Sequence, residues 1–158
     1  MFRKVLIPID GSRTAARGLD VAIKLAKGQK AALVILHVLD TRLVSGGEVV
    51  SVYLDEIIKS LRVIGEKVLA QAVAKARASG LKPRSLLVEE FGRPVAHTIV
   101  AQARKLRADV IVLGTHGRRG VTRLVMGSDA EGVVRRSPVP VLLVRSRERQ
   151  RPPVKRRK

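Results

Sequence analysis

Residues 5–12 read VLIPIDGS, and this stretch decides the fold that we expect for the rest of the chain. Val5–Ile9 is a short apolar run that stops at Asp10 and Gly11, and such a run is typical of a strand buried on both faces of a sheet. The segment that follows, residues 12–27, spaces its apolar side chains as a helix does. A buried strand followed at once by an amphipathic helix predicts a parallel α/β fold.

The same alternation continues toward the C-terminus. Further strands are expected at residues 31–39, 84–90, 109–114 and 139–144, and further helices at residues 54–79, 94–107 and 128–136. We therefore predict a single α/β domain over residues 1–145, built on a doubly wound, five-stranded parallel sheet with helices on both faces. Ligands of such sheets bind beyond the carboxyl ends of the strands, where the strand order reverses. Candidate segments at that edge are residues 10–12, 38–41 and 114–128.

Composition narrows the class of protein. The 158 residues suit one domain, and the absence of cysteine excludes disulfides, thiolate metal sites and cysteine nucleophiles. The apolar run near the N-terminus is too short for a signal peptide or a membrane span. We expect a cytoplasmic protein that does not enter a membrane.

The chain is strongly basic, with a formal net charge of +19. Eight Lys or Arg and one Glu lie between Arg145 and the C-terminus, and residues 146–158 are predicted to form a disordered basic tail. An anionic partner is expected. The tail is either solvated or binds nucleic acid weakly and without sequence preference, so a nucleic-acid-associated protein is one alternative function.

A glycine-rich segment follows the expected fourth strand. It reads GTHGRRG from Gly114 to Gly120, and Gly127-Ser128 opens the next helix. Glycines let backbone N–H groups approach phosphate oxygens, and a helix N-terminus adds donors and a favourable dipole. The segment is neither a Walker loop nor a Rossmann fingerprint. Spacing alone leaves a second interpretation open, in which the glycines only shape the loop and Ser128 caps the helix in a capping box with Glu131.

The pattern Gly114-x2-Gly117-x9-Gly127-Ser128 resembles the ATP-binding motif of the universal stress protein family. Other segments of the chain are similar to strands and turns of that family, namely residues 5–12, 36–38, 108–114 and 137–144. The resemblance implies an ATP-binding stress-response regulatory protein that acts as a dimeric, nucleotide-dependent switch. It also implies that the closing strand, Val139–Val144, pairs with a second copy across a two-fold axis to form a homodimer.

The resemblance assigns roles to the adenosine side of the site. Asp10 is expected to hydrogen-bond the ribose or adenine, with Pro8 lining the pocket. Val38 is expected to contact adenine through its backbone, and Leu113 and Gly114 to pack under the ribose and phosphates.

The phosphates are assigned to the glycine-rich segment. Gly117, Gly127 and Ser128 are expected to hold them, and Arg118 adds positive charge. His116 either contacts phosphate or packs within the loop. Phosphate geometry alone does not separate ATP from ADP, AMP or a cyclic dinucleotide.

Asp129, which follows Ser128, has two interpretations. It is either an acid placed to suit the helix dipole or a ligand for Mg²⁺ bound together with the phosphates. We predict no catalytic residues, because no nucleophile stands in a recognised setting such as G-x-S-x-G. Slow hydrolysis of ATP is retained as an alternative activity.

Overall fold

Five parallel strands form one sheet in the order β3-β2-β1-β4-β5. The computed structural model describes residues 1–41, 51–115 and 127–145. The strands are β1 (Lys4–Pro8), β2 (Ala32–Asp40), β3 (Arg84–Glu90), β4 (Val110–Gly114) and β5 (Val141–Val144). The order runs outward from β1 in both directions, so the predicted doubly wound α/β fold is confirmed.

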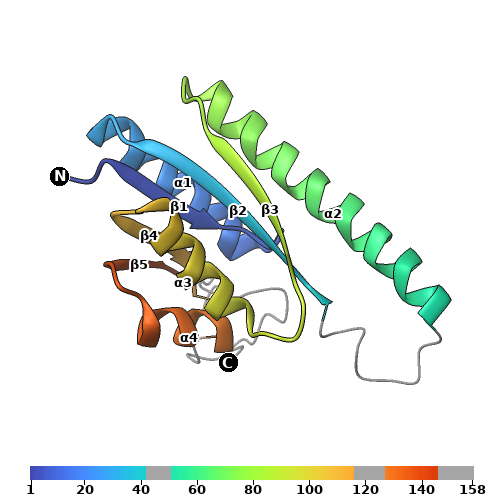
Figure 1. Ribbon diagram of the computed structural model, residues 1–158. Helices are drawn as coiled ribbons and strands as arrows, with labels where there is room; N and C mark the ends of the chain where they lie inside the picture. The colour runs from blue at the N-terminus through green and yellow to red at the C-terminus, as the bar shows by residue number, and fades with distance from the viewer. Residues whose placement is uncertain (42–50, 116–126, 146–158) are drawn as a thin grey trace, which may run out of the picture.

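Helices cover both faces of the sheet, as Figure 1 shows. They are α1 (Arg13–Gln29), α2 (Ser51–Ala78), α3 (Val95–Leu106) and α4 (Ser128–Arg136). In β1, Val5 and Ile7 are fully buried against the α1–α2 layer, whereas Leu6 is fully buried against the α3–α4 layer. Neighbouring residues of a strand point to opposite faces, so a continuous apolar run serves both layers.

Local signals fix several helix ends. Ser12 caps α1 by accepting a hydrogen bond from the Ala15 N–H at 3.1 Å. Beyond α2, Gly80 adopts a φ of 83° and donates its N–H to the Arg77 carbonyl, as expected for a glycine after a helix. The strand expected at residues 139–144 begins only at Val141, because Pro140 has no N–H to pair.

Two predictions fall on other parts of the chain. The predicted basic tail at residues 146–158 lies outside the described residues, and so do residues 42–50 between the expected strand at 31–39 and the expected helix at 54–79. Within the part that the structure describes, no helix is long and apolar enough to cross a membrane.

Candidate functional site

The strand order reverses between β1 and β4, the central neighbours of the sheet. After β1 the chain continues to β2 and β3 on one side of the sheet, and after β4 it continues to β5 on the other side. The segments that follow β1 and β4 therefore lead away from each other. This is the position at which sheets of this kind bind ligands. We call the group formed by Asp10, Val38, Gly114, Gly127 and Ser128 the strand-end site.

Backbone hydrogen bonds hold the start of α4 at this edge of the sheet. Gly127 donates its N–H to the Thr115 carbonyl at 2.9 Å, and Thr115 donates its own N–H to the Val144 carbonyl at 3.0 Å. These bonds tie Gly127 to the ends of β4 and β5. The two ends of the glycine-rich segment therefore meet, although its central residues His116, Gly117 and Arg118 lie outside the described residues.

Gly127, rather than Ser128, is the N-cap of α4. Ser128 is the first helical residue, is exposed, and makes no side-chain cap at this helix start. The alternative prediction of a Ser128–Glu131 capping box is therefore wrong, and the Glu131 carboxylate instead pairs with Arg135 at 2.7 Å. Since Gly127 has no side chain, the N–H groups of the first turn are not covered by a cap from within the helix.

Gly114 ends β4 where α1 begins to cross the sheet. A Cβ built on Gly114 would lie 2.9 Å from the Thr14 carbonyl carbon and 3.0 Å from the Ala15 nitrogen. Any side chain at this position would collide with backbone, so the close approach of α1 requires glycine. The contact fixes the start of α1, and with it the turn that carries Asp10.

Asp10 lies in the turn between β1 and α1 and is partly buried. Its Oδ1 accepts a hydrogen bond from the Ser12 N–H at 2.9 Å, while Gly11 between them has a φ of 82°. The carboxylate is therefore held beside the carboxyl end of β1 by its own turn.

Val38 extends β2 beyond the end of β1. The pairing of these strands ends at Pro8 and Leu36, and the Leu36 carbonyl accepts from the Ile9 N–H at 2.8 Å. Backbone groups two residues apart in a strand point the same way. The N–H and C=O of Val38 therefore face the region past β1, toward the turn that holds Asp10.

Two further predicted site residues, Pro8 and Leu113, are buried at the ends of β1 and β4, whereas Asp129 is exposed. Pro8 is buried at the end of β1, and Leu113 is only 6% exposed in the core beneath α3 and α4. Leu113 therefore supports the site from the core side. Asp129 is exposed in the first turn of α4.

The histidines provide no metal centre in the part of the chain that the structure covers. His37 is buried and its Nδ1 lies 2.7 Å from the Ile9 carbonyl, which joins β2 to the turn after β1. His97 is exposed on α3. Among residues 1–41, 51–115 and 127–145, no group of three or more His, Asp or Glu side chains could hold a metal ion.

Two features of the site were missed from the sequence. One is the hydrogen bond between Gly127 and Thr115, for which the sequence offers no signal because it joins backbone atoms. The other is the contact of Gly114 with Thr14 and Ala15. A second glycine, Gly18, faces the same crossing, since its Cβ would lie 3.6 Å from the Gly114 nitrogen. Glycine inside an amphipathic helix is a signal of such close packing.

Comparisons with known proteins agree on one family. The sequence model of the universal stress protein family matches residues 1–145. Universal stress protein YxiE of Bacillus subtilis strain 168 is 35% identical over 151 residues, covering 92% of this chain and 100% of the relative. The structure of the hypothetical protein MJ0577 is similar with a TM-score of 0.83 and 25% identity, covering 94% of this chain and 99% of that one.

A third similar protein carries a bound ligand. It is a universal stress protein in complex with cAMP, with a TM-score of 0.64 and 25% identity, covering 91% of this chain and 97% of that one.

Proposed function

The chain belongs to the universal stress protein family, and from that premise we propose that it binds an adenine nucleotide, ATP in particular, at the strand-end site. A similar member of the family is found in complex with cAMP, which supports an adenine nucleotide as the ligand class. The bound nucleotide would serve regulation rather than rapid turnover.

One observation carries the proposal, and it concerns Gly127. Its φ of −61° and ψ of 148° are open to every residue type, so the backbone does not require glycine there. Ser, Thr, Asp and Asn at an N-cap satisfy the first N–H groups of a helix through their side chains, whereas glycine, which is also common there, offers no side-chain acceptor. Glycine at this position leaves those donors for an outside acceptor, and phosphate suits both the donors and the dipole of α4.

The rest of the site fits the adenosine part of such a ligand. Asp10 offers a carboxylate to ribose hydroxyls, and Val38 offers backbone groups past the end of β1. Gly117 and Arg118, together with His116, complete the proposal on the phosphate side.

A titration of ATP by calorimetry tests the proposal with wild type, Gly127→Val and Gly28→Ala. The φ and ψ of Gly127 are open to valine, whose side chain would cover the helix start. ATP affinity should fall at least tenfold in a variant that circular dichroism shows to be folded. Gly28 is the matched control because nothing lies within 4 Å of its Cβ position, and its affinity should stay at the wild-type value. Equal affinity in all three proteins, or no binding at millimolar ATP, would refute the proposal.

We further propose that the protein works as a homodimer and as a nucleotide-dependent switch. β5 is an edge strand, and Leu142 and Leu143 on it are 40% and 37% exposed. Edge strands with exposed apolar side chains readily pair with another chain.

The proposed nucleotide-dependent switch is tested by limited trypsin digestion. Bound ATP should slow cleavage at Arg118, Arg119 and Arg123, and an unchanged cleavage rate would argue against the switch.

A further inference from the structure

Exposed cations gather at the amino ends of the strands, opposite the strand-end site. All strands are parallel and each helix returns the chain, so strand starts and helix ends share this end of the molecule. We define the amino-end rim as eight exposed residues of this end: Arg3, Lys27, Lys30, Lys82, Arg84, Arg104, Lys105 and Arg107.

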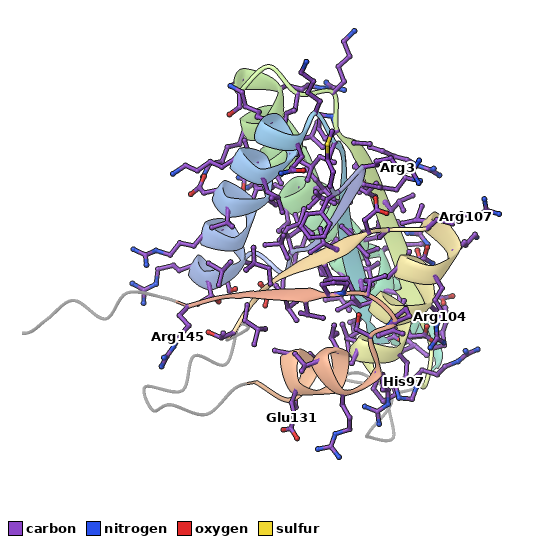
Figure 2. All side chains as sticks on the ribbon, turned by 90° about the vertical axis from the view of Figure 1, so that its left-hand side faces the viewer. Arg3, His97, Arg104, Arg107, Glu131 and Arg145 are labelled. Carbon is purple, nitrogen blue, oxygen red and sulfur yellow. The ribbon has the colours of Figure 1, made fainter. Side chains whose placement is uncertain are left out.

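Backbone contacts place these cations in one row along the sheet. Asp109, two residues after Arg107, donates its N–H to the Lys4 carbonyl at 2.9 Å, and Ala32 donates its N–H to the Arg3 carbonyl at 2.8 Å. Arg84 stands in register with Val34 of β2. The row therefore follows the starts of β4, β1, β2 and β3. Figure 2 shows Arg3, Arg104 and Arg107 on the same side of the molecule, away from Arg145 at the end of β5.

No rim cation forms a salt bridge with a side chain of the described residues, although the Asp109 carboxylate interacts electrostatically with Arg3. The ion pairs of this part of the chain join Arg62, Lys75, Arg93 and Arg135 to carboxylates, and none of these cations belongs to the rim. The carboxylate closest along the chain to Arg107, Asp109, is engaged by the backbone N–H groups of Arg3 and Lys4 at 2.8 and 2.7 Å.

Carboxylates collect instead at the other end of the sheet. Asp10, Asp40, Glu89 and Glu90 follow or end strands there, and Asp129 lies in the first turn of α4. The described part of the domain thus has a positive end and an end where carboxylates concentrate.

Two of the rim cations stand where glycine would be less strained. Lys30 and Arg107 end α1 and α3 with φ of 53° and 51°, and among the described residues they alone combine a positive φ with a side chain. Gly80 performs the same turn after α2. A cation at the C-terminus of a helix compensates the helix dipole, and this explains in part why Lys and Arg rather than glycine stand at positions 30 and 107. It does not explain Arg3, Lys82 and Arg84, which lie outside helices.

From this arrangement we propose that the amino-end rim binds the phosphate backbone of duplex nucleic acid, without sequence preference. A row of unpaired cations matches the dense phosphate charge of a duplex. Single strands are favoured by exposed aromatic rings, whereas Phe2, the ring nearest the rim in sequence, packs against the core. Interfacial membrane binding requires an apolar face. Met1 is exposed close to Arg3 in the sequence but is a single side chain, and the exposed Leu142 and Leu143 lie on β5 rather than on the rim.

Fluorescence anisotropy with a labelled 20-base-pair DNA duplex, recorded on the full chain over a series of salt concentrations, tests the proposal. The rim variant combines Lys30→Gly, Arg84→Gln, Arg104→Gln and Arg107→Gly. The two glycine changes relieve positive φ, so the variant remains folded. A matched control removes the same number of exposed cations elsewhere: Arg13→Gln, Arg17→Gln, Lys59→Gln and Lys67→Gln. Both variants keep the basic segment 146–158.

The rim variant should bind at least tenfold more weakly at about 0.1 M salt, and its salt slope should be shallower by about 3 to 4, close to 0.9 per lost phosphate contact. The control slope should change by less than about 1. Equal losses in the two variants would assign binding to net charge or to segment 146–158 and overturn the proposal. It would also be overturned if wild type did not bind duplex at low salt, or if the rim changes weakened binding to anionic lipid vesicles but not to the duplex.

Discussion

Asp129 is an acidic side chain one residue away from the proposed phosphate contact of Ser128. It is exposed in the first turn of α4, where a carboxylate suits the positive end of the helix dipole. The same charge repels a phosphate bound at that helix start unless a cation lies between them. The role of Asp129 therefore depends on whether nucleotide is bound with Mg²⁺.

We expect Asp129 to act as a helix-start acid, so ATP affinity measured with EDTA should equal the affinity measured with Mg²⁺. Asp129→Asn removes the repulsion and should strengthen ATP binding severalfold in both conditions. Weaker binding in EDTA by wild type, together with loss of that difference in Asp129→Asn, would instead establish Asp129 as a Mg²⁺ ligand.

The chemistry of individual site residues could be predicted only in part. The positions of Asp10 in a turn and of Gly127 at a helix start were visible as short local patterns, whereas their roles toward a nucleotide stay predictions from the family resemblance. Ser128 was assigned to the cap in the capping-box alternative, although the cap is Gly127, one residue earlier, because cap position depends on backbone angles that spacing does not reveal. Gly114 was predicted as a site residue, but its contact with α1 was not foreseen because it joins residues a hundred positions apart.

At the scale of elements, the crossing of α1 over β4 depends on Gly114. Gly114→Ala would place a Cβ 2.9 Å from the Thr14 carbonyl carbon, and backbone cannot move aside as a side-chain tip can. Overpacking of this kind costs about 1–3 kcal/mol, so the free energy of unfolding should fall by that amount. Urea unfolding without nucleotide measures it, with Gly28→Ala as the control that should not lose stability. An unchanged Gly114→Ala protein would show that α1 is not held by this contact.

The starts of β1 and β4 are joined by the Asp109 carboxylate. Hydrogen bonds from the backbone N–H of Arg3 and then of Lys4 lower the pKa of Asp109 below its ordinary value of 3.8. A carboxyl group whose pKa is lowered on folding stabilises the protein above its unfolded pKa, and this stabilisation is lost as pH falls through the folded pKa.

Asp109→Asn should therefore lower the melting temperature at pH 7, and the difference from wild type should shrink as the pH falls below about 4. Thermal unfolding followed by circular dichroism between pH 2.5 and 7 records the difference. A difference that stays constant with pH would show that the charge of Asp109 does not contribute.

Element boundaries followed the sequence closely where local signals were strong. The strand at Arg84–Glu90 and the helix at Ser128–Arg136 have the predicted bounds, and Gly80 marks the turn after α2. The closing strand is shorter than expected, because apolar character continues through Val139 while Pro140 interrupts pairing. Hydropathy reports burial, but hydrogen bonding decides where a strand begins.

For the whole molecule, the doubly wound parallel sheet with helices on both faces was predictable because alternating strands and helices admit few arrangements. The separation of cations at the amino ends of the strands from carboxylates at the carboxyl ends was not predictable from the sequence. Cations such as Lys30, Arg84 and Arg107 are distant in sequence, and only the parallel sheet brings their positions into one row. The total charge of +19 indicated an anionic partner but not the surface that would meet it.

Assembly is also decided at this scale, by the exposed edge strand β5. Because Leu142 and Leu143 are exposed there, we expect light scattering at micromolar concentration to give the mass of two chains. Leu142→Glu with Leu143→Glu should give the mass of one chain while the circular dichroism spectrum is retained. A monomeric wild-type protein would rule out the dimer.

We propose that nucleotide binds at the carboxyl ends of the strands, and a nuclear magnetic resonance titration of the labelled full chain with ATP would locate the bound ligand. We expect the amide signals of Val38, Gly114, Gly127 and Ser128 to shift together and saturate, while those of the amino-end rim do not. Saturable shifts confined to rim amides such as Arg3, Lys30 and Arg107 would refute binding at the strand-end site, because ATP would then be held by surface charge alone.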